Sequence, residues 1–132
     1  MEKLITTLSA IFTLAFAAAA QPDVSFQHEL QRSIDRGIAS LEKSQDQNGY
    51  WTSEDHPAVT AIVLVAYHSN PRKPEKNPAW VEKAHAYLLK FVQKNGSIYV
   101  PGKGMANYNT ALSMMAMLTS GDKKYNATII NA

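Results

Sequence analysis

Apolar residues recur every three or four positions near the start of the chain: Phe26, Leu30, Ile34, Ile38 and Leu41. This spacing forms one stripe along a helix, so it predicts an amphipathic helix over about 26–44. Gly37 lies on or beside the stripe. Because glycine costs about 1 kcal/mol inside a helix, we expect a packing reason for it, such as the close approach of a neighbour.

A second segment is apolar at nearly every position. Residues 58–66 read AVTAIVLVA and follow Pro57, a residue favoured in the first turn of a helix. The β-branched residues leave a strand as the alternative, but the proline and the alanines favour a helix over about 57–68. A helix that is apolar all round is buried on all sides.

Three further helices are predicted from the same signals. One spans about 79–94, after the cap signal Asn77-Pro78, and Asn95-Gly96 closes it. The next spans about 109–120, and residues 124–132 look like the opening of another. Amphipathic and fully apolar helices therefore alternate, which predicts an all-α fold with two layers, one outer and one inner helix in each unit.

The chain also aligns with itself. Segment 36–51 matches segment 83–98 at an offset of 47, pairing Arg36 with Lys83, Leu41 with Leu88, Asn48 with Asn95 and Gly49 with Gly96. The apolar helices match at an offset near 50, pairing Thr60-Ala61 with Thr110-Ala111. A period of this length with two helices per unit predicts a helical repeat.

Residues 1–20 have the composition of a secretory signal. Residues 4–20 are apolar or small, and Ala18 and Ala20 form a small-x-small cleavage pattern before Gln21-Pro22. This stretch is shorter than the roughly 20 apolar residues of a membrane span. We expect a signal peptide over 1–20, a mature domain over 21–132 and export to the periplasm or the extracellular space. An uncleaved membrane anchor is the alternative.

Composition excludes several kinds of site. The chain has 132 residues, a formal net charge of +2 and no cysteine. Its basic residues are scattered among acidic ones without a basic stripe, which argues against nucleic-acid binding. Without cysteine, an exported protein has no disulfide framework, so its core depends on packing alone. Thiolate nucleophiles and thiolate metal ligands are excluded as well.

The first aligned segment resembles the QW motif of squalene–hopene and oxidosqualene cyclases. Six of its residues fit that motif: Arg36, Gly37, Leu41, Gln45, Gly49 and Trp51. Ser40 stands where the motif has an aromatic residue. The second segment is degenerate, because Val92 replaces the glutamine and Ile98 the tryptophan.

This resemblance covers about residues 30–132 and implies αα-hairpin repeats that form part of an (α/α) toroid, as in the terpene cyclase and protein prenyltransferase superfamily. In that family, QW motifs tie adjacent outer helices together and are not catalytic. Gln45 is then expected to bridge to free backbone groups at a neighbouring helix end, with Trp51 stacked over its amide and Gly49 allowing the turn. The third repeat would begin near residue 131, so we expect about two repeats and an N-terminal fragment of a toroid.

The superfamily's chemistry does not carry over with the motif. No Asp-x-Asp-Asp acid motif occurs, and the prenyltransferase zinc site needs a cysteine that this chain lacks. We therefore expect no catalytic residue, no metal and no cofactor. The sequence leaves open whether the chain has an enzymatic activity of this superfamily.

The remaining candidates for chemistry are polar clusters and histidines. Glu54, Asp55 and His56 form the densest polar cluster, in a loop that would rim a toroid cavity, although a solvated helix cap is the more ordinary interpretation. His28 and His85 lie on amphipathic helices and are predicted at the surface. His68 ends the 57–68 helix, about 18 Å from the cluster, so the two cannot share a metal.

Two functions follow. The first is a truncated, by itself non-catalytic member of an isoprenoid cyclase-like family. The second is a binding or scaffold module for a lipid, an isoprenoid or a protein partner. Because two repeats leave an apolar inner-helix face uncovered, we also expect self-association.

Overall fold

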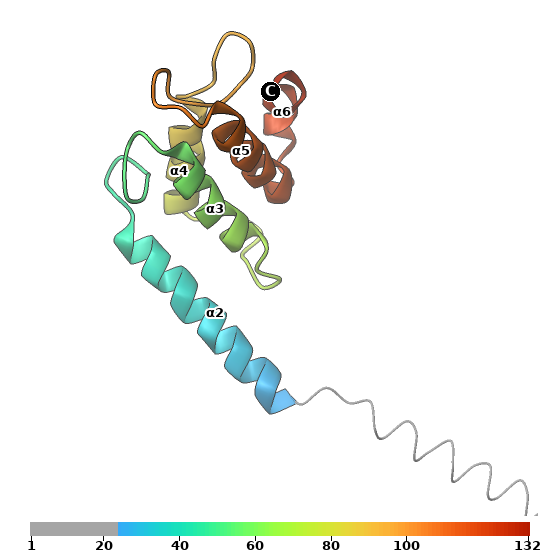
Figure 1. Cartoon of the computed structure of the whole chain (residues 1–132). Helices are drawn as coiled ribbons and strands as arrows, with labels where there is room; N and C mark the ends of the chain where they lie inside the picture. The colour runs from blue at the N-terminus through green and yellow to red at the C-terminus, as the bar shows by residue number, and fades with distance from the viewer. Residues whose placement is uncertain (1–23) are drawn as a thin grey trace, which may run out of the picture. The chain divides into compact units, whose positions relative to one another are not determined.

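A computed structural model describes residues 24–132; the expected signal segment, residues 1–20, lies outside them. The described residues form α2 (Val24–Ser44), α3 (Pro57–His68), α4 (Ala79–Leu89), α5 (Ala106–Ser120), a 3₁₀ turn η1 (Lys123–Tyr125) and α6 (Asn126–Asn131) (Figure 1). This part of the chain contains no strand, and its one β-feature is an isolated antiparallel bridge between Val92 and Ile98. The all-α prediction is confirmed.

The chain divides into two compact units, residues 1–36 and residues 37–132. In the first unit the described residues are the helical stretch 24–36. Its side chains bond along the helix: Gln31 Nε2 donates to Asp35 Oδ1 at 2.7 Å, and Ser33 Oγ donates to the Glu29 carbonyl at 2.9 Å. These are contacts between residues four apart, which face each other on a helix surface.

The predicted helix over 57–68 has the expected bounds, with Pro57 in its first turn. The helix predicted over 79–94 is shorter and ends at Leu89. Its last turn tightens through bonds between residues three apart, such as Lys90 N–H to the Tyr87 carbonyl at 3.2 Å. The chain then turns back so that Ile98 becomes fully buried. Asn95-Gly96 therefore belongs to this turn and does not cap the helix as predicted.

The fourth predicted helix begins earlier than expected. α5 starts at Ala106, because Met105 takes a left-handed conformation with φ 56° and ends the preceding loop there. The helix ends before Gly121, whose φ of 70° is easily adopted by glycine, as the sequence predicts. The predicted opening of a fifth helix corresponds to η1 and α6.

The core of the second unit lies among α3, α4 and α5. α3 and α5 lie side by side, and α3 also packs against α4 (Figure 1). The largest fully buried apolar side chains come from several elements: Leu64, Val81, Leu88, Ile98 and Met117. The half-buried residues Ile38 and Leu41 of α2 pack against this core.

Two turns of the second unit share one hydrogen-bond pattern. In the first, Asp46 N–H donates to the Tyr50 carbonyl and Gly49 N–H to the Asp46 carbonyl, both at 2.9 Å. In the second, Gln93 N–H donates to the Ser97 carbonyl at 2.8 Å, and Gly96 N–H to the Gln93 carbonyl at 3.0 Å. Each pair of partners in the second turn lies 47 residues after its counterpart in the first.

The residues after these turns also match. Trp51 N–H donates to Thr60 Oγ1 at 3.4 Å, and Ile98 N–H donates to Thr110 Oγ1 at 2.9 Å. One threonine belongs to α3 and the other to α5, so these bonds give the two helices an offset of 50. Each turn is thus anchored to the helix that follows it through the same atoms.

Candidate functional site

Gln45, the glutamine of the motif-like segment, joins α2 to α4. Its Nε2 donates to the Trp80 carbonyl at 2.9 Å and to the Gly49 carbonyl at 3.2 Å. The predicted bridge to a neighbouring helix end is present. Its acceptor differs from the prediction, because a carbonyl in the first turn of a helix is not one of the free backbone groups there. Gln45 uses a second lone pair of that carbonyl.

Trp51 closes the end of α2. Its indole Nε1–H donates to the Leu41 carbonyl at 3.0 Å and lies 3.2 Å from Ser44 Oγ. The carbonyls of the last helical turn lack intrahelical donors, so this bond satisfies one of them. The motif predicts that the Trp51 ring stacks over the Gln45 amide. In the structure the ring packs edge-to-face against Trp80, with ring centroids 6.0 Å apart.

The other residues of the motif-like segment differ in what they contact. Gly49 has φ 97°, and a Cβ atom there would lie 2.6 Å from the Lys83 carbonyl oxygen, so both conformation and space require glycine. Gly37 is not required by space. A Cβ atom there would meet no described atom within 4 Å, so the expected close neighbour is not found. Arg36 is exposed and its Nε donates to the Arg32 carbonyl at 3.3 Å.

The polar cluster Glu54-Asp55-His56 lies in the loop before α3. Asp55 forms an ion pair with Lys103 at 2.8 Å, and the Glu54 carbonyl accepts from the Tyr87 hydroxyl at 2.8 Å. His56 precedes the helix but makes no side-chain capping bond. An open cavity of about 390 Å³ is lined in part by Glu54, Asp55 and Tyr87. Among the described residues, no group of three or more His, Asp or Glu side chains is placed to hold a metal ion.

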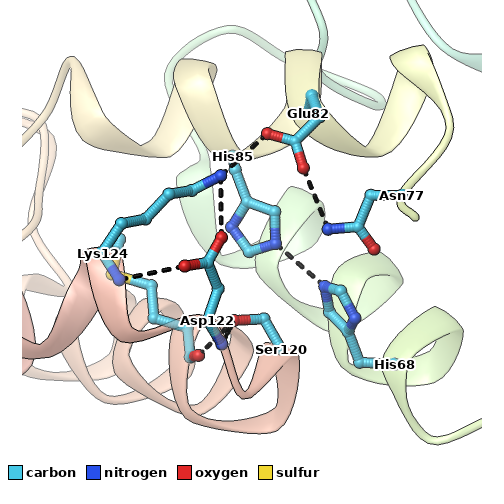
Figure 2. A network of polar contacts seen from close by, with 8 residues as sticks. His68, Asn77, Glu82, His85, Ser120, Asp122 and Lys124 are labelled. Carbon is cyan, nitrogen blue, oxygen red and sulfur yellow. Dashed lines mark hydrogen bonds and ion pairs between the residues drawn. The ribbon is translucent and has the colours of Figure 1, made fainter. Parts of the chain in front are cut away.

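A buried histidine pair links α3 and α4. His68 Nε2 and His85 Nε2 face each other at 2.9 Å, and their side chains are 4% and 1% exposed. Figure 2 shows the two rings edge to edge, His68 from α3 and His85 from α4. The His85 ring stacks on Tyr125 of η1, with centroids 4.7 Å apart. The prediction that His85 lies at the surface is wrong.

Burial keeps this pair neutral. Burial, together with the nearby Lys73 ammonium, lowers the pKa of His68 to about 4. Burial and the neighbouring His68 lower the pKa of His85 to about 4. At neutral pH one ring therefore donates its Nε2–H to the other. Both Nδ1 atoms are buried without a hydrogen-bond partner in the described chain, which is costly and marks the pair as a weak point of the core.

A charged network lies beside the pair. Lys124 Nζ contacts Glu82 Oε2 and Asp122 Oδ2, both at 3.0 Å, and Asn77 Nδ2 donates to Glu82 Oε1 at 2.9 Å (Figure 2). Hydrogen bonds from Asn77 and Lys124 lower the pKa of the Glu82 carboxyl. These exposed ion pairs connect the start of α4 to the turn after α5 and contribute modestly to stability.

The histidine pair is therefore structural, because side chains this buried are closed to a substrate. The sequence contained a signal for the position of His85. It lies four residues after Val81, one after Ala84 and three before Leu88, all fully buried. That spacing places His85 on the apolar stripe of α4.

Two neighbouring helices leave apolar surface uncovered. On α5 the exposed apolar residues are Tyr108, Ala111, Met115 and Leu118, here called the α5 face. On α3 the half-buried Val59 and the exposed Ile62 and Ala66 are here called the α3 face; Val65 is also half-buried. Ile62 is 47% exposed and Leu118 61%. The expectation that these two helices expose apolar side chains is confirmed, whereas the expectation that the 57–68 helix is buried on all sides is wrong.

A small cavity opens where α3 and α5 begin. Its volume is about 200 Å³, and it is lined by His56, Ala58, Val59, Met105, Tyr108 and Asn109. Val59 and Tyr108 also belong to the two faces, so the cavity continues them. Asn109, one of the lining residues, also links the two helices, because its Oδ1 accepts from Ala58 N–H at 3.3 Å. This apolar surface is the candidate binding site.

None of the helices described here is long and apolar enough to cross a membrane. Comparison of the chain with protein-family models, with curated proteins and with solved structures finds no match.

Proposed function

We propose that this chain is a helical-repeat module of the squalene-cyclase and prenyltransferase type, which performs no catalysis by itself and binds an apolar partner through the α3 and α5 faces. The observation that carries the proposal is the uncovered apolar surface of two adjacent helices. Single exposed apolar residues are ordinary, whereas apolar residues gathered along one side of a helix, as on each of these two faces, are typical of a binding surface.

The repeat character is supported by the matched turns. The turn at Asp46 and the turn at Gln93 use the same backbone bonds 47 residues apart. Gly49 approaches the backbone of Lys83 in α4, and a Cβ at Gly96 would overlap the backbone of Asn131 in α6, so each turn approaches the backbone of a later helix in the same way. Local repetition of this kind is what stacked αα-hairpins produce.

The non-catalytic character is supported by the sequence, since it lacks the acid motif and the zinc ligands of the superfamily. The size of the cavity at the start of α3 and α5 favours a binding function over an enclosed catalytic cavity. At about 200 Å³ it is smaller than the roughly 300–1,000 Å³ of most small-molecule sites. This size also favours the second candidate, a module whose apolar faces hold a protein partner.

Binding of cis-parinaric acid, an apolar polyene whose fluorescence rises when it leaves water, tests the proposed surface. We expect the full chain to bind it and Met115→Glu to weaken binding at least tenfold, since a carboxylate would then be placed in the apolar contact. Ile130→Glu is the matched control, because Ile130 lies on α6 and is 83% exposed. Equal binding by the wild-type chain and Met115→Glu would refute the proposal.

A further inference from the structure

The α3 and α5 faces are related by the internal offset of 50 residues. The bonds from Trp51 to Thr60 and from Ile98 to Thr110 set this register. Residues of the α5 face then correspond to α3 residues 58, 61, 65 and 68, and residues of the α3 face correspond to α5 residues 109, 112 and 116. Each exposed face therefore has a counterpart on the other helix of the same chain.

The α5 face is equivalent to a side of α3 that is already covered. Ala58 and Ala61 are buried and Val65 is half-buried, and the Ala58 N–H bonds to Asn109 of α5, so this side of α3 begins beside α5. His68, at the other end of this side, contacts His85 of α4. Their equivalents, Tyr108 and Ala111, are exposed. α5 therefore exposes positions whose equivalents at the start of α3 are buried next to α5.

The converse holds for the α3 face. Asn109 and Ala116 lie seven residues apart on one side of α5 and are buried, with Asn109 bonded to α3. Their equivalents on α3 are Val59 and Ala66, which are half-buried and exposed. α3 therefore presents to solvent the side that α5 uses to pack on α3.

We propose that a second copy of this chain docks head to tail, with its α3 face on the α5 face of the first copy, and so reproduces the α3–α5 packing between molecules. This inference rests on the proposed function and names the apolar partner. The contact continues an interface that exists within each chain. Neither α3 nor α5 contains Asp, Glu, Lys or Arg, so docking would bury no charged side chain of either helix.

The geometry is heterologous, because two different faces meet. A docked pair leaves one α3 face and one α5 face free, one at each end, so further copies add until the array closes into a ring or continues as a filament. A two-fold symmetric dimer would bring like faces together and would not extend.

Complementation between two variants tests this arrangement. Leu118→Glu damages only the α5 face and Ile62→Glu only the α3 face, and both side chains are about half exposed or more, so folding does not depend on them. The full chain is purified in the form its host processes, with the N-terminus read by mass spectrometry. Sedimentation equilibrium is then measured for the wild-type chain, each variant, their equimolar mixture and Ile130→Glu as control.

We expect the wild-type chain and Ile130→Glu to associate, and each face variant alone to associate at least tenfold more weakly. The mixture retains one intact α3 face and one intact α5 face, so it should form a 1:1 dimer that grows no further. A monomeric wild-type chain, or a mixture no more associated than its components, overturns the inference.

Disulfide trapping provides a second readout, since the chain contains no cysteine. The contact of Ala58 with Asn109 has the intermolecular equivalent Tyr108 with Val59. We expect Tyr108→Cys and Val59→Cys, mixed and oxidised, to give chiefly the mixed disulfide. Chiefly homodisulfides would overturn head-to-tail docking. A monomeric chain whose binding of cis-parinaric acid is still lost in Met115→Glu would overturn this inference and leave the proposed function standing.

Discussion

The buried histidine pair predicts that this protein loses stability in mild acid. In the unfolded chain both histidines protonate near the ordinary value of pH 6.5, whereas in the folded chain both stay neutral down to about pH 4. Between these values the unfolded state binds more protons. The free energy of unfolding therefore falls as the pH falls through this window and is unaffected by the pair above it.

The magnitude follows from the two pKa values. Between pH 7.5 and pH 4.5 the linkage amounts to about 2.5 kcal/mol for each histidine, and about 5 kcal/mol for the pair. The carboxyls of Glu82 and Asp122 also have lowered pKa values, but their contribution is lost mainly below about pH 4.5, outside this window. A loss of this size is comparable to the whole stability of many small domains.

Urea unfolding followed by tryptophan fluorescence measures the effect, because Trp51 and Trp80 are buried. The double variant His68→Phe/His85→Phe removes both titrating groups and keeps a ring at each position. Each protein is compared with its own value at pH 7.5, so a uniform loss from repacking does not matter. We expect the variant to lose the pH dependence between 6.5 and 4.5, and the exposed His28→Phe control to keep it. A double variant with the wild-type slope would refute the assignment.

Three further predictions concern the turn that follows α2 and contacts α4, and chemical unfolding measures each. Gly49→Ala should destabilise the chain by about 3 kcal/mol, combining a positive φ with a steric overlap, whereas Gly102→Ala, which has a positive φ and open space, should cost about 1 kcal/mol; equal losses would contradict the close approach. Gln45→Glu removes both amide donors and should cost about 2 kcal/mol, since the carboxylate would face the Trp80 carbonyl; no loss would mean that the bridge is dispensable. Trp51→Phe should cost about 2 kcal/mol through the lost indole N–H bonds and volume, and a value near zero would contradict its role at the end of α2.

Helix positions were predictable from the sequence where local signals agree. The bounds 57–68 follow from a proline, a continuous apolar run and a polar loop. Where a helix end depends on what the following chain packs against, prediction failed. α4 stops at Leu89 because the burial of Ile98 draws the chain back, and no local signal marks that residue.

The candidate site was predictable in kind more than in detail. A small set of helices that includes two apolar ones cannot cover both on every side, so the existence of an apolar surface followed from the pattern alone. Which residues compose it did not. Ile62 and Leu64 are equally apolar neighbours in one helix, yet one is exposed and the other fully buried.

The helical character of residues 24–132 and the matched turns 47 residues apart follow from the order of the residues, because helix periodicity and glycine turns are local properties of the chain. The meeting of His85 with His68 in the core became visible only in the folded chain. The same is true of the exposure of Tyr108 and Ala111 on α5, whose counterparts 50 positions earlier, Ala58 and Ala61, are buried. Both results depend on distances between segments far apart in the chain, which packing sets and local preference does not.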